Sequence, residues 1–383
     1  MPEKKNQHYV PRYVLKPWSD SNDQISCYHL DSERSFNEDV GSVCSRGYFY
    51  GQKHVEDALE KLDRYHSWPL NEIRDGTPIS ELSPQHKQLL LSYIGTQRNR
   101  TRSEKNDISS GEDMFREAAE DDMLAGRYEH LIEWRGEVSE DEKLDALVDA
   151  SIKGIHHFLI IYGIFSYGVL GDLDGAILRN ATDHDYIISD TPIVHDNPRF
   201  KDERGTRIAG TAERGLQIIT PIDRRRSLLL YDPLVYNVDS NHRQELIITE
   251  SDVIEEINLL QLHNAGDIVM EHTSNRGYIS SIAHRTEEFR RRENIEKEIG
   301  GDEMPSWRIS NEESHQTPLK SPDLSGVSSN SGIRYTEPRD EELMLQSKQM
   351  PRYAMDVADE ASDVALIGAI RFLESNLGIS GQD

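Results

Sequence analysis

Polar residues that could do chemistry gather first in the opening stretch NQHYVPRYVLKPW, residues 6–18. Pro11 disfavours helix at the residue before it, so we expect an extended strand that carries His8 toward the core. His8 could act as a general acid or base, and Arg12 could hold a phosphate or carboxylate. The alternative is a terminal strand whose polar side chains cap nearby backbone groups.

A second polar group is TQRNRTR, residues 96–102, at the end of an expected helix. Ser83 is suited to be the N-cap of that helix, and Pro84 is suited to its first helical position. Gln97 could offer an amide to a ligand, and Arg100 a fork-shaped guanidinium. The alternative is a basic helix end that complements its own dipole.

The densest polar group is TDHDYIISDTPIVHDNP, residues 182–198. We expect a strand over 185–190, which places Asp190 at its end beside Pro192. A carboxylate there could bind a divalent metal ion or act as a base. Because Asp before Pro is also a common turn former, the alternative is a structural turn.

The fourth group is TPIDRRRSLLL, residues 220–230, in which Arg224, Arg225 and Arg226 join two strand-like runs. The pattern predicts a basic hairpin tip. Alternatively, three consecutive arginines could approach a phosphate or an acidic partner.

These groups need elements to hold them, and the periodicity predicts an α+β fold. Helical spacing dominates residues 55–160, although Pro69 is expected to kink or end the first of these helices. Strand-like runs follow over 170–235. We therefore expect a helical middle packed on a mostly antiparallel sheet that also takes in the N-terminal strands.

The sequence suggests one domain and two appendages. Residues 1–299 are expected to form a single α+β domain. Residues 300–345 are rich in Gly, Ser and Pro and are predicted to be a flexible linker. The tail, 346–383, contains a short amphipathic helix that could pack back on the domain or bind a protein partner.

Composition excludes several classes of protein. The formal charge of −26 argues against broad nucleic-acid binding. Only 13 of the 43 basic residues are Lys, which is typical of halophile-like surfaces, although an ordinary acidic protein is the alternative. Cys27 and Cys44 lack the spacing of a zinc site or a disulfide framework. The longest apolar run, 158–165, is too short to span a bilayer, so we expect a cytoplasmic protein without a membrane partner.

The motifs QHYVPRYVLKPW, TQRNRT, IISDTP, PIDRRRSLLL and INLLQLHNA occur in this order over residues 7–275. In order and spacing they resemble the domain of unknown function 4238 family. The polar positions that the resemblance singles out are His8, Pro11, Gln97, Arg100, Ser189, Asp190, Pro192 and Asn258. Thr191 stands where the family usually has Asn, so an amide is not essential there. The resemblance implies that these distant residues share a pocket.

Two functions follow as hypotheses, and the residues leave open whether the protein is an enzyme. The first is a hydrolase acting on a phosphate-bearing substrate, such as a nucleotide or a nucleic-acid phosphodiester. Its catalytic residues would be His8 and Asp190, with Asp190 also a candidate metal ligand. Its substrate-binding residues would be Arg12, Gln97, Arg100 and Asn258.

The second hypothesis is a non-catalytic protein that binds a ligand or a partner. In it the same polar set locks the N-terminal strand against the central helix. A divalent metal cofactor belongs only to the first hypothesis, and no tight metal motif occurs in the sequence.

Overall fold

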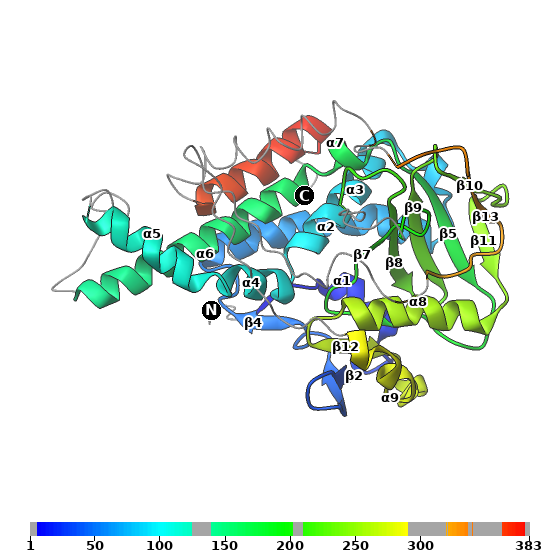
Figure 1. Ribbon diagram of the computed structural model, residues 1–383, viewed down its shortest axis with the longest axis horizontal. Coiled ribbons are helices and arrows are strands. Elements are labelled where there is room, and N and C mark those ends of the chain that lie inside the picture. The colour runs from blue at the N-terminus through cyan, green and yellow to red at the C-terminus, as the bar shows by residue number, and fades with distance from the viewer. Residues whose placement is uncertain are drawn as a thin grey trace.

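The computed structural model describes residues 6–124, 139–201, 210–289, 321–335 and 362–379, together with Leu319 and Arg339. Its helices and mostly antiparallel strands confirm the α+β fold (Figure 1). The longer helices are α2 (Lys53–Arg74), α3 (Pro84–Asn99), α4 (Arg102–Ser109), α5 (Glu112–Leu124), α6 (Glu140–Ile164) and α8 (Ser251–Asn264). The short helical segments are α1 (Arg12–Leu15), η1 (Lys16–Trp18), η2 (Ile79–Glu81), α7 (Tyr167–Leu170), η3 (Thr273–Asn275), α9 (Tyr278–Ile282) and η4 (Ala283–Phe289).

Helix α3 begins where the sequence predicts. The Ser83 hydroxyl accepts a hydrogen bond from the His86 backbone N–H at 3.1 Å, which caps α3. α3 and α6 then cross at two glycines: a Cβ on Gly163 would lie 2.5 Å from the Gly95 carbonyl oxygen. Any larger residue at either position would push the two helices apart.

Of the two outcomes expected at Pro69, a kink or an end of the helix, the structure rules out the end of α2 there. The helix continues through it to Arg74, and the residues beyond it, Leu70 and Ile73, are both 1% exposed. A proline inside a helix costs about 3 kcal/mol, and each buried Leu or Ile side chain returns about 1.5–3 kcal/mol. Burial of the last helical turn therefore outweighs the local penalty.

The central sheet has five strands in the order β11-β5-β9-β8-β7. These are β5 (Asp174–Asn180), β7 (Val194–Asp196), β8 (Gln217–Asp223), β9 (Arg226–Tyr231) and β11 (Glu245–Ile248). Neighbouring strands are antiparallel except for the parallel pair β11 and β5. The strand-like runs of residues 170–235 supply four of the five strands.

The N-terminal strands do not join this sheet, which corrects the expectation. They form a second sheet in the order β3-β2-β12-β6, made of β2 (Gln24–His29), β3 (Arg34–Asp39), β6 (Ile188–Ser189) and β12 (Ile268–Glu271). The predicted strand over 185–190 is thus only two residues long. Two further pairs are β1 (Asn6–His8) with β4 (Ser45–Gly47), and β10 (Tyr236–Val238) with β13 (Val327–Ser329).

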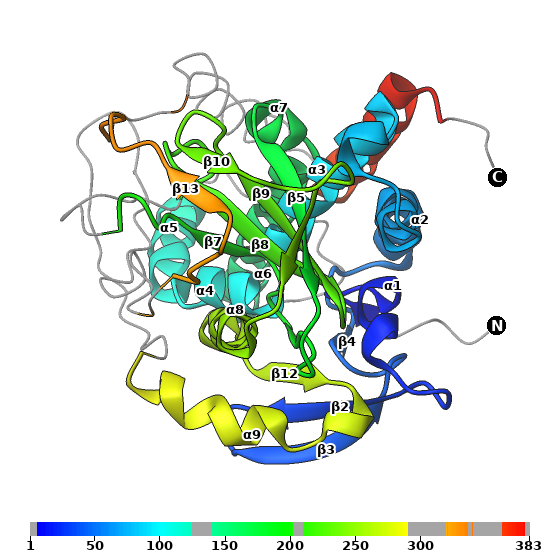
Figure 2. The same ribbon diagram turned by 90° about the vertical axis from the view of Figure 1, so that its right-hand side faces the viewer.

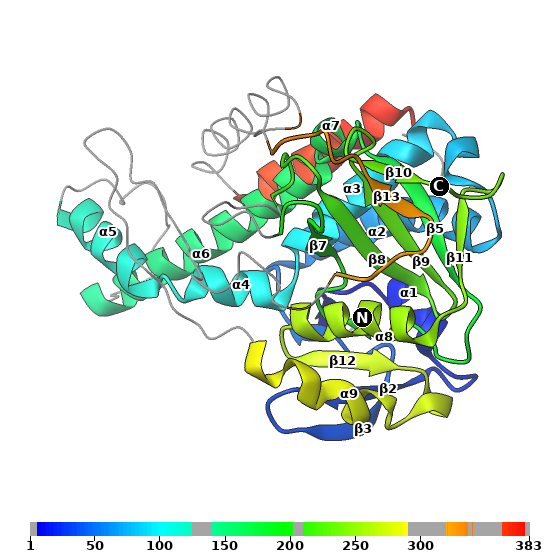
Figure 3. The same ribbon diagram turned by 45° about the vertical axis from the view of Figure 1, so that its right-hand side comes forward.

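Helix α8 lies between the two sheets, as Figures 2 and 3 show. Ile254 and Ile257 on one side of it pack with strand residues of the central sheet. Leu259 and Leu262 on another side pack with Tyr28 and other residues of the second sheet. A helix buried on both sides must be apolar around much of its circumference, which explains the run INLLQL.

Helix α6 is the one described helix with the length and apolar composition to cross a membrane. Half of its apolar window is buried inside the protein, and Leu144, Ile152 and Ile160 contribute to the core. Its first turn is acidic and carries a capping box between Ser139 and Glu142. These features are typical of a core helix in a globular protein.

Part of the predicted linker and tail packs on the domain. β13 pairs with β10, and the Arg339 guanidinium contacts the Asp172 carboxylate with its Nε 2.9 Å away. The amphipathic helix of the tail is confirmed over residues 362–377 and lies along α6 in Figure 1. Leu366 and Leu373 on it are 0% exposed in the main core. The remaining residues of 300–361 lie outside the described part of the chain.

Candidate functional site

Arg100 anchors the N-terminal strand. Its Nη2 donates a hydrogen bond to the His8 backbone carbonyl at 2.8 Å, and its Nε donates to the Tyr50 hydroxyl at 2.9 Å. Its Nη1 forms an ion pair with Asp63. Burial by itself lowers the pKa of Arg100, but the charge of Asp63 outweighs this effect and the pKa is raised overall. The guanidinium is 2% exposed, so its hydrogen-bonding groups are directed at the protein rather than at solvent.

Gln97 performs a similar task one turn earlier in α3. Its Nε2 donates to the Tyr9 backbone carbonyl at 3.0 Å, and the side chain is 1% exposed. Arg12 is exposed at the start of α1. The two predicted substrate-binding groups on α3 therefore hold the backbone of the opening strand.

His8 is a neutral imidazole near pH 7. Burial lowers its pKa to about 4, and the positive charges of Arg12 and Arg100 act in the same direction. Its Nε2 is buried without a hydrogen-bond partner among the residues that the structure describes. The contact between Arg100 and this residue is made through the His8 backbone carbonyl and not through the imidazole.

Asp190 follows β6 and binds the turn after α8. One carboxylate oxygen accepts from the Gly266 N–H at 2.8 Å, and the other accepts from the Asp267 and Ile268 N–H groups at 2.8 and 3.2 Å. Burial raises the pKa of Asp190 to about 6, although these backbone hydrogen bonds oppose the rise. The carboxylate thus closes the turn at residues 266–268, which is not the local turn beside Pro192 that the sequence offered as the alternative.

Different charges act on the groups around His8 and around Asp190. The charges that act on His8 are those of Arg12 and Arg100, whereas Asp190 acts on Tyr9 and Cys44. Across residues 6–124, 139–201, 210–289 and the shorter described segments, no three His, Cys, Asp or Glu side chains are placed to hold a metal ion. The geometry therefore offers Asp190 no partners for a metal centre.

A pocket does occur at the turn between β8 and β9. Its volume is about 450 Å³. Its lining comprises four arginines together with proline, asparagine and aspartate: Pro17, Arg179, Asn180, Asp223, Arg224, Arg225 and Arg226. We call this space the arginine pocket.

The β8–β9 hairpin and its neighbour β5 position the arginines. β8 ends at Asp223 and β9 begins at Arg226, so Arg224 and Arg225 form the two-residue turn. Arg179 on β5 lies directly opposite Arg226 in the antiparallel register. Two like charges at such positions repel each other across the strand pair.

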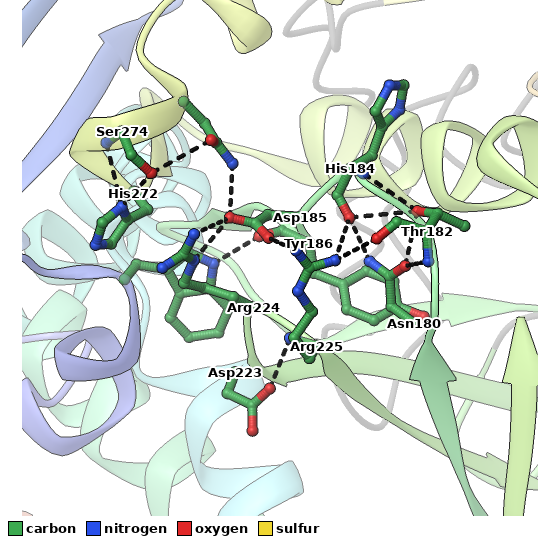
Figure 4. Close-up of polar contacts among 12 residues, drawn as sticks. Asn180, Thr182, His184, Asp185, Tyr186, Asp223, Arg224, Arg225, His272 and Ser274 are labelled. Carbon is green, nitrogen blue, oxygen red and sulfur yellow. Dashed lines mark hydrogen bonds and ion pairs between the residues drawn. The ribbon is translucent and has the colours of Figure 1, made fainter. Parts of the chain in front are cut away.

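Carboxylates partly neutralise these arginines. Asp185 accepts from the Arg224 Nε at 2.7 Å, and its other oxygen lies 3.1 Å from Arg225 Nη2 (Figure 4). Arg226 Nη1 donates to Asp223 at 2.7 Å. Arg179 has only a 3.4 Å contact, with Glu245. These last two lining arginines keep most of their N–H groups without a partner among the described residues.

The loop that carries Asp185 is held by two side chains, Trp18 and Asn258. The Trp18 indole N–H donates to the Tyr186 carbonyl at 2.7 Å. Asn258 on α8 accepts from the Ile187 N–H at 3.1 Å and donates to the Asp185 carbonyl at 2.9 Å. Asn258 is 0% exposed, so it orders the loop instead of meeting a ligand.

Three of the five sequence motifs therefore contribute to this pocket or to the loop beside it. The opening motif supplies Trp18, the RRR motif supplies the turn, and the α8 motif supplies Asn258. Asp185 comes from the residues just before the motif IISDTP. The sequence singled out residues 224–226 but not Arg179. Only the strand register reveals Arg179, because it lies 47 positions before Arg226 in the chain.

The fold and the pocket define a two-sheet α+β protein with a cationic pocket at the hairpin turn of the central sheet. The model of the family described as "Protein of unknown function (DUF4238)" matches residues 6–275, and the chain belongs to that family. The matched range contains the pocket and the elements that hold it. No curated protein and no solved structure matches the chain.

Proposed function

We propose that this protein binds a small phosphate-bearing ligand in the arginine pocket, and that the polar set of the N-terminal strand serves the fold. The observation that carries the proposal is the cross-strand pair of Arg179 and Arg226 on the pocket wall. Like charges directly opposite in a sheet destabilise it. An anion bound between them would remove that repulsion.

The donors in the pocket suit a phosphate group. A guanidinium presents its N–H groups as a planar fork that matches two oxygens of a phosphate or carboxylate. Arg179 and Arg226 are 51% and 30% exposed, so both can reach a ligand that enters from solvent. The position of the pocket at a turn between two strands leaves it open to small molecules.

The overall charge limits the size of the ligand. A formal charge of −26 repels a long polyanion, whereas a small phosphate compound samples only the local field of the pocket. The proposal keeps the expectation of no broad nucleic-acid binding. It also keeps the expectation of a cytoplasmic protein without a membrane partner.

A protein partner for the C-terminal helix stays a separate prediction, which does not depend on the arginine pocket. The inner side of residues 362–377 is already occupied by the domain core. Val364 and Phe372 are 67% and 56% exposed on the same helix, so a partner would meet the outer side.

Calorimetric titration with inorganic phosphate and with phenyl phosphate tests the proposal. We expect Arg179→Gln and Arg226→Gln each to weaken binding by about tenfold, because each removes charge-assisted hydrogen bonds to the anion. The matched control is Arg34→Gln, which makes the same charge change on exposed β3 of the other sheet. Its affinity should stay within about twofold of the wild type.

Two results would overturn the proposal. The first is wild-type protein that binds neither anion, and the second is a control variant that weakens binding as much as the pocket variants. The hydrolase alternative is tested on the same samples with p-nitrophenyl phosphate and bis(p-nitrophenyl) phosphate in the presence of Mg²⁺ or Mn²⁺. Turnover that disappears in His8→Gln and Asp190→Asn, with both variants still folded, would favour that alternative.

A further inference from the structure

A buried carboxylate beside the arginine pocket pairs with two of the arginines that line it. Asp185 is 5% exposed, and its Oδ2 lies 2.7 Å from Arg224 Nε and 2.6 Å from Arg224 Nη2. Its Oδ1 lies 3.1 Å from Arg225 Nη2, and Asn275 donates to Oδ2 at 2.6 Å. Figure 4 shows Arg224 and Arg225 converging on this one side chain.

The lining arginines form two pairs, which we call the turn half (Arg224 and Arg225) and the strand half (Arg179 and Arg226) of the pocket. In the turn half, Arg224 and Arg225 direct N–H groups at Asp185, and Arg225 also donates to the Thr182 carbonyl at 2.5 Å. In the strand half, Arg179 and Arg226 have one carboxylate contact each. The open donors therefore lie on the strand half.

We infer that Asp185 is the residue that sets the ligand class of the pocket, restricting it to compounds that present a single phosphate group. This inference rests on the proposed function. The four lining arginines carry a formal charge of +4, and their carboxylate partners Asp185, Asp223 and Glu245 carry −3, which leaves +1. One phosphate matches that excess.

A chain of phosphates does not match this excess positive charge. A second or third phosphate would have to lie over the turn half, where the guanidinium groups already bind a carboxylate. The added negative charge would face Asp185 at short range, and like charges disfavour each other most where water is excluded. Pyrophosphate and tripolyphosphate should therefore bind only slightly more tightly than inorganic phosphate, although they carry more charge.

Replacing Asp185 tests the inference, because Asn has the same shape without the charge. The variant Asp185→Asn releases the charge of Arg224 and Arg225 to a ligand. Calorimetric titration of wild type and variant with inorganic phosphate, pyrophosphate and tripolyphosphate, in magnesium-free buffer, gives the affinity ratio of tripolyphosphate to phosphate. We expect this ratio to be below about fivefold in the wild type and to rise by about tenfold or more in the variant.

The control for overall charge is Asp31→Asn, on the exposed turn between β2 and β3. It should leave the ratio unchanged. A wild-type protein that already prefers tripolyphosphate by more than tenfold, or a ratio that does not rise in Asp185→Asn, would refute the inference and leave phosphate binding intact. A wild type that binds none of the three anions would instead refute the proposed function.

A second variant decides the question if Asp185→Asn does not fold. Because Asp185 already neutralises the turn half, Arg225→Gln should weaken phosphate binding by less than about threefold, against about tenfold for Arg226→Gln. Equal losses in the two variants would show that a single phosphate uses both halves, and would overturn the assignment to Asp185.

Discussion

Replacing Arg100 by Met tests whether its guanidinium anchors the N-terminal strand. Met keeps most of the length of the stem but removes the charge and all the N–H donors. The bonds lost are those to the His8 carbonyl, the Tyr50 hydroxyl and Asp63. The Asp63 carboxylate, whose pKa is already raised by burial, then loses its counter-charge.

The magnitude follows from these contacts. Breaking a buried ion pair by removing one partner costs about 3–5 kcal/mol, and Arg100 is 2% exposed, so little of that loss is screened by solvent. We expect the free energy of unfolding to fall by about 4 kcal/mol. With an unfolding entropy of roughly 0.6 kcal/mol/K for the ~300 residues that the structure describes, this corresponds to a Tm lower by about 6 °C.

Urea unfolding followed by tryptophan fluorescence measures the change, since the chain has four Trp residues. The matched control is Arg46→Met, which replaces an exposed arginine on β4, the strand paired with β1. Its cost should lie within about 0.5 kcal/mol. If Arg100→Met costs less than ~1 kcal/mol and weakens anion binding instead, the anchor argument is wrong and Arg100 is a ligand-binding residue.

Four further predictions concern stability. Burial lowers the pKa of His66 to about 3. The neutral side chain therefore stabilises the fold above pH ~6.5, and that stability is lost as the pH falls from ~6.5 to about 3. His66→Gln should flatten the pH profile of urea unfolding over this range. Burial raises the pKa of Asp190 to about 6, so its pH dependence has the opposite sign. The contribution of Asp190 to the free energy of unfolding is largest at low pH and falls by up to ~3 kcal/mol as the pH rises from about 4 to about 6. Asp190→Asn should remove this component. Trp18→Phe leaves the Tyr186 carbonyl without its donor and should cost about 1–3 kcal/mol in urea unfolding. Phosphate binding should also weaken, because the loop beside the pocket loosens. Unchanged affinity would show that the loop is held without the indole. Leu373→Ala should cost about 2–5 kcal/mol of domain stability, and a stable domain with an intact transition would show that the C-terminal helix contributes nothing to the core.

Several features of the fold could be read from sequence because their causes are local. The cap at Ser83 and the capping box at Ser139 each need only residues within one helical turn, and the Ser83 cap forms as predicted. The α+β class follows from a change of hydrophobic period along the chain. The helix does not end at Pro69 because the side chains of the turn beyond it are buried, and the local sequence does not show that burial.

The roles of the polar residues depend on partners that the sequence does not reveal. Arg100 looks the same in sequence whether it holds a ligand or the His8 carbonyl 92 positions away. Asp190 likewise matches a metal ligand by type, and only the turn after α8 brings three N–H donors to it. Local pattern cannot separate these alternatives, because both use the same charge and the same hydrogen-bonding groups.

The sequence by itself determined the family, the acidic character and the basic hairpin tip at residues 224–226. The tertiary structure alone decided that Arg179 lies opposite Arg226 and that Asp185 neutralises the turn beside them. The physical reason is register: a strand pair aligns residues that are distant in the chain, and a shift of one position would turn Arg179 to the other face of the sheet. The pocket exists only because that alignment is fixed by the buried faces of β5 and β9.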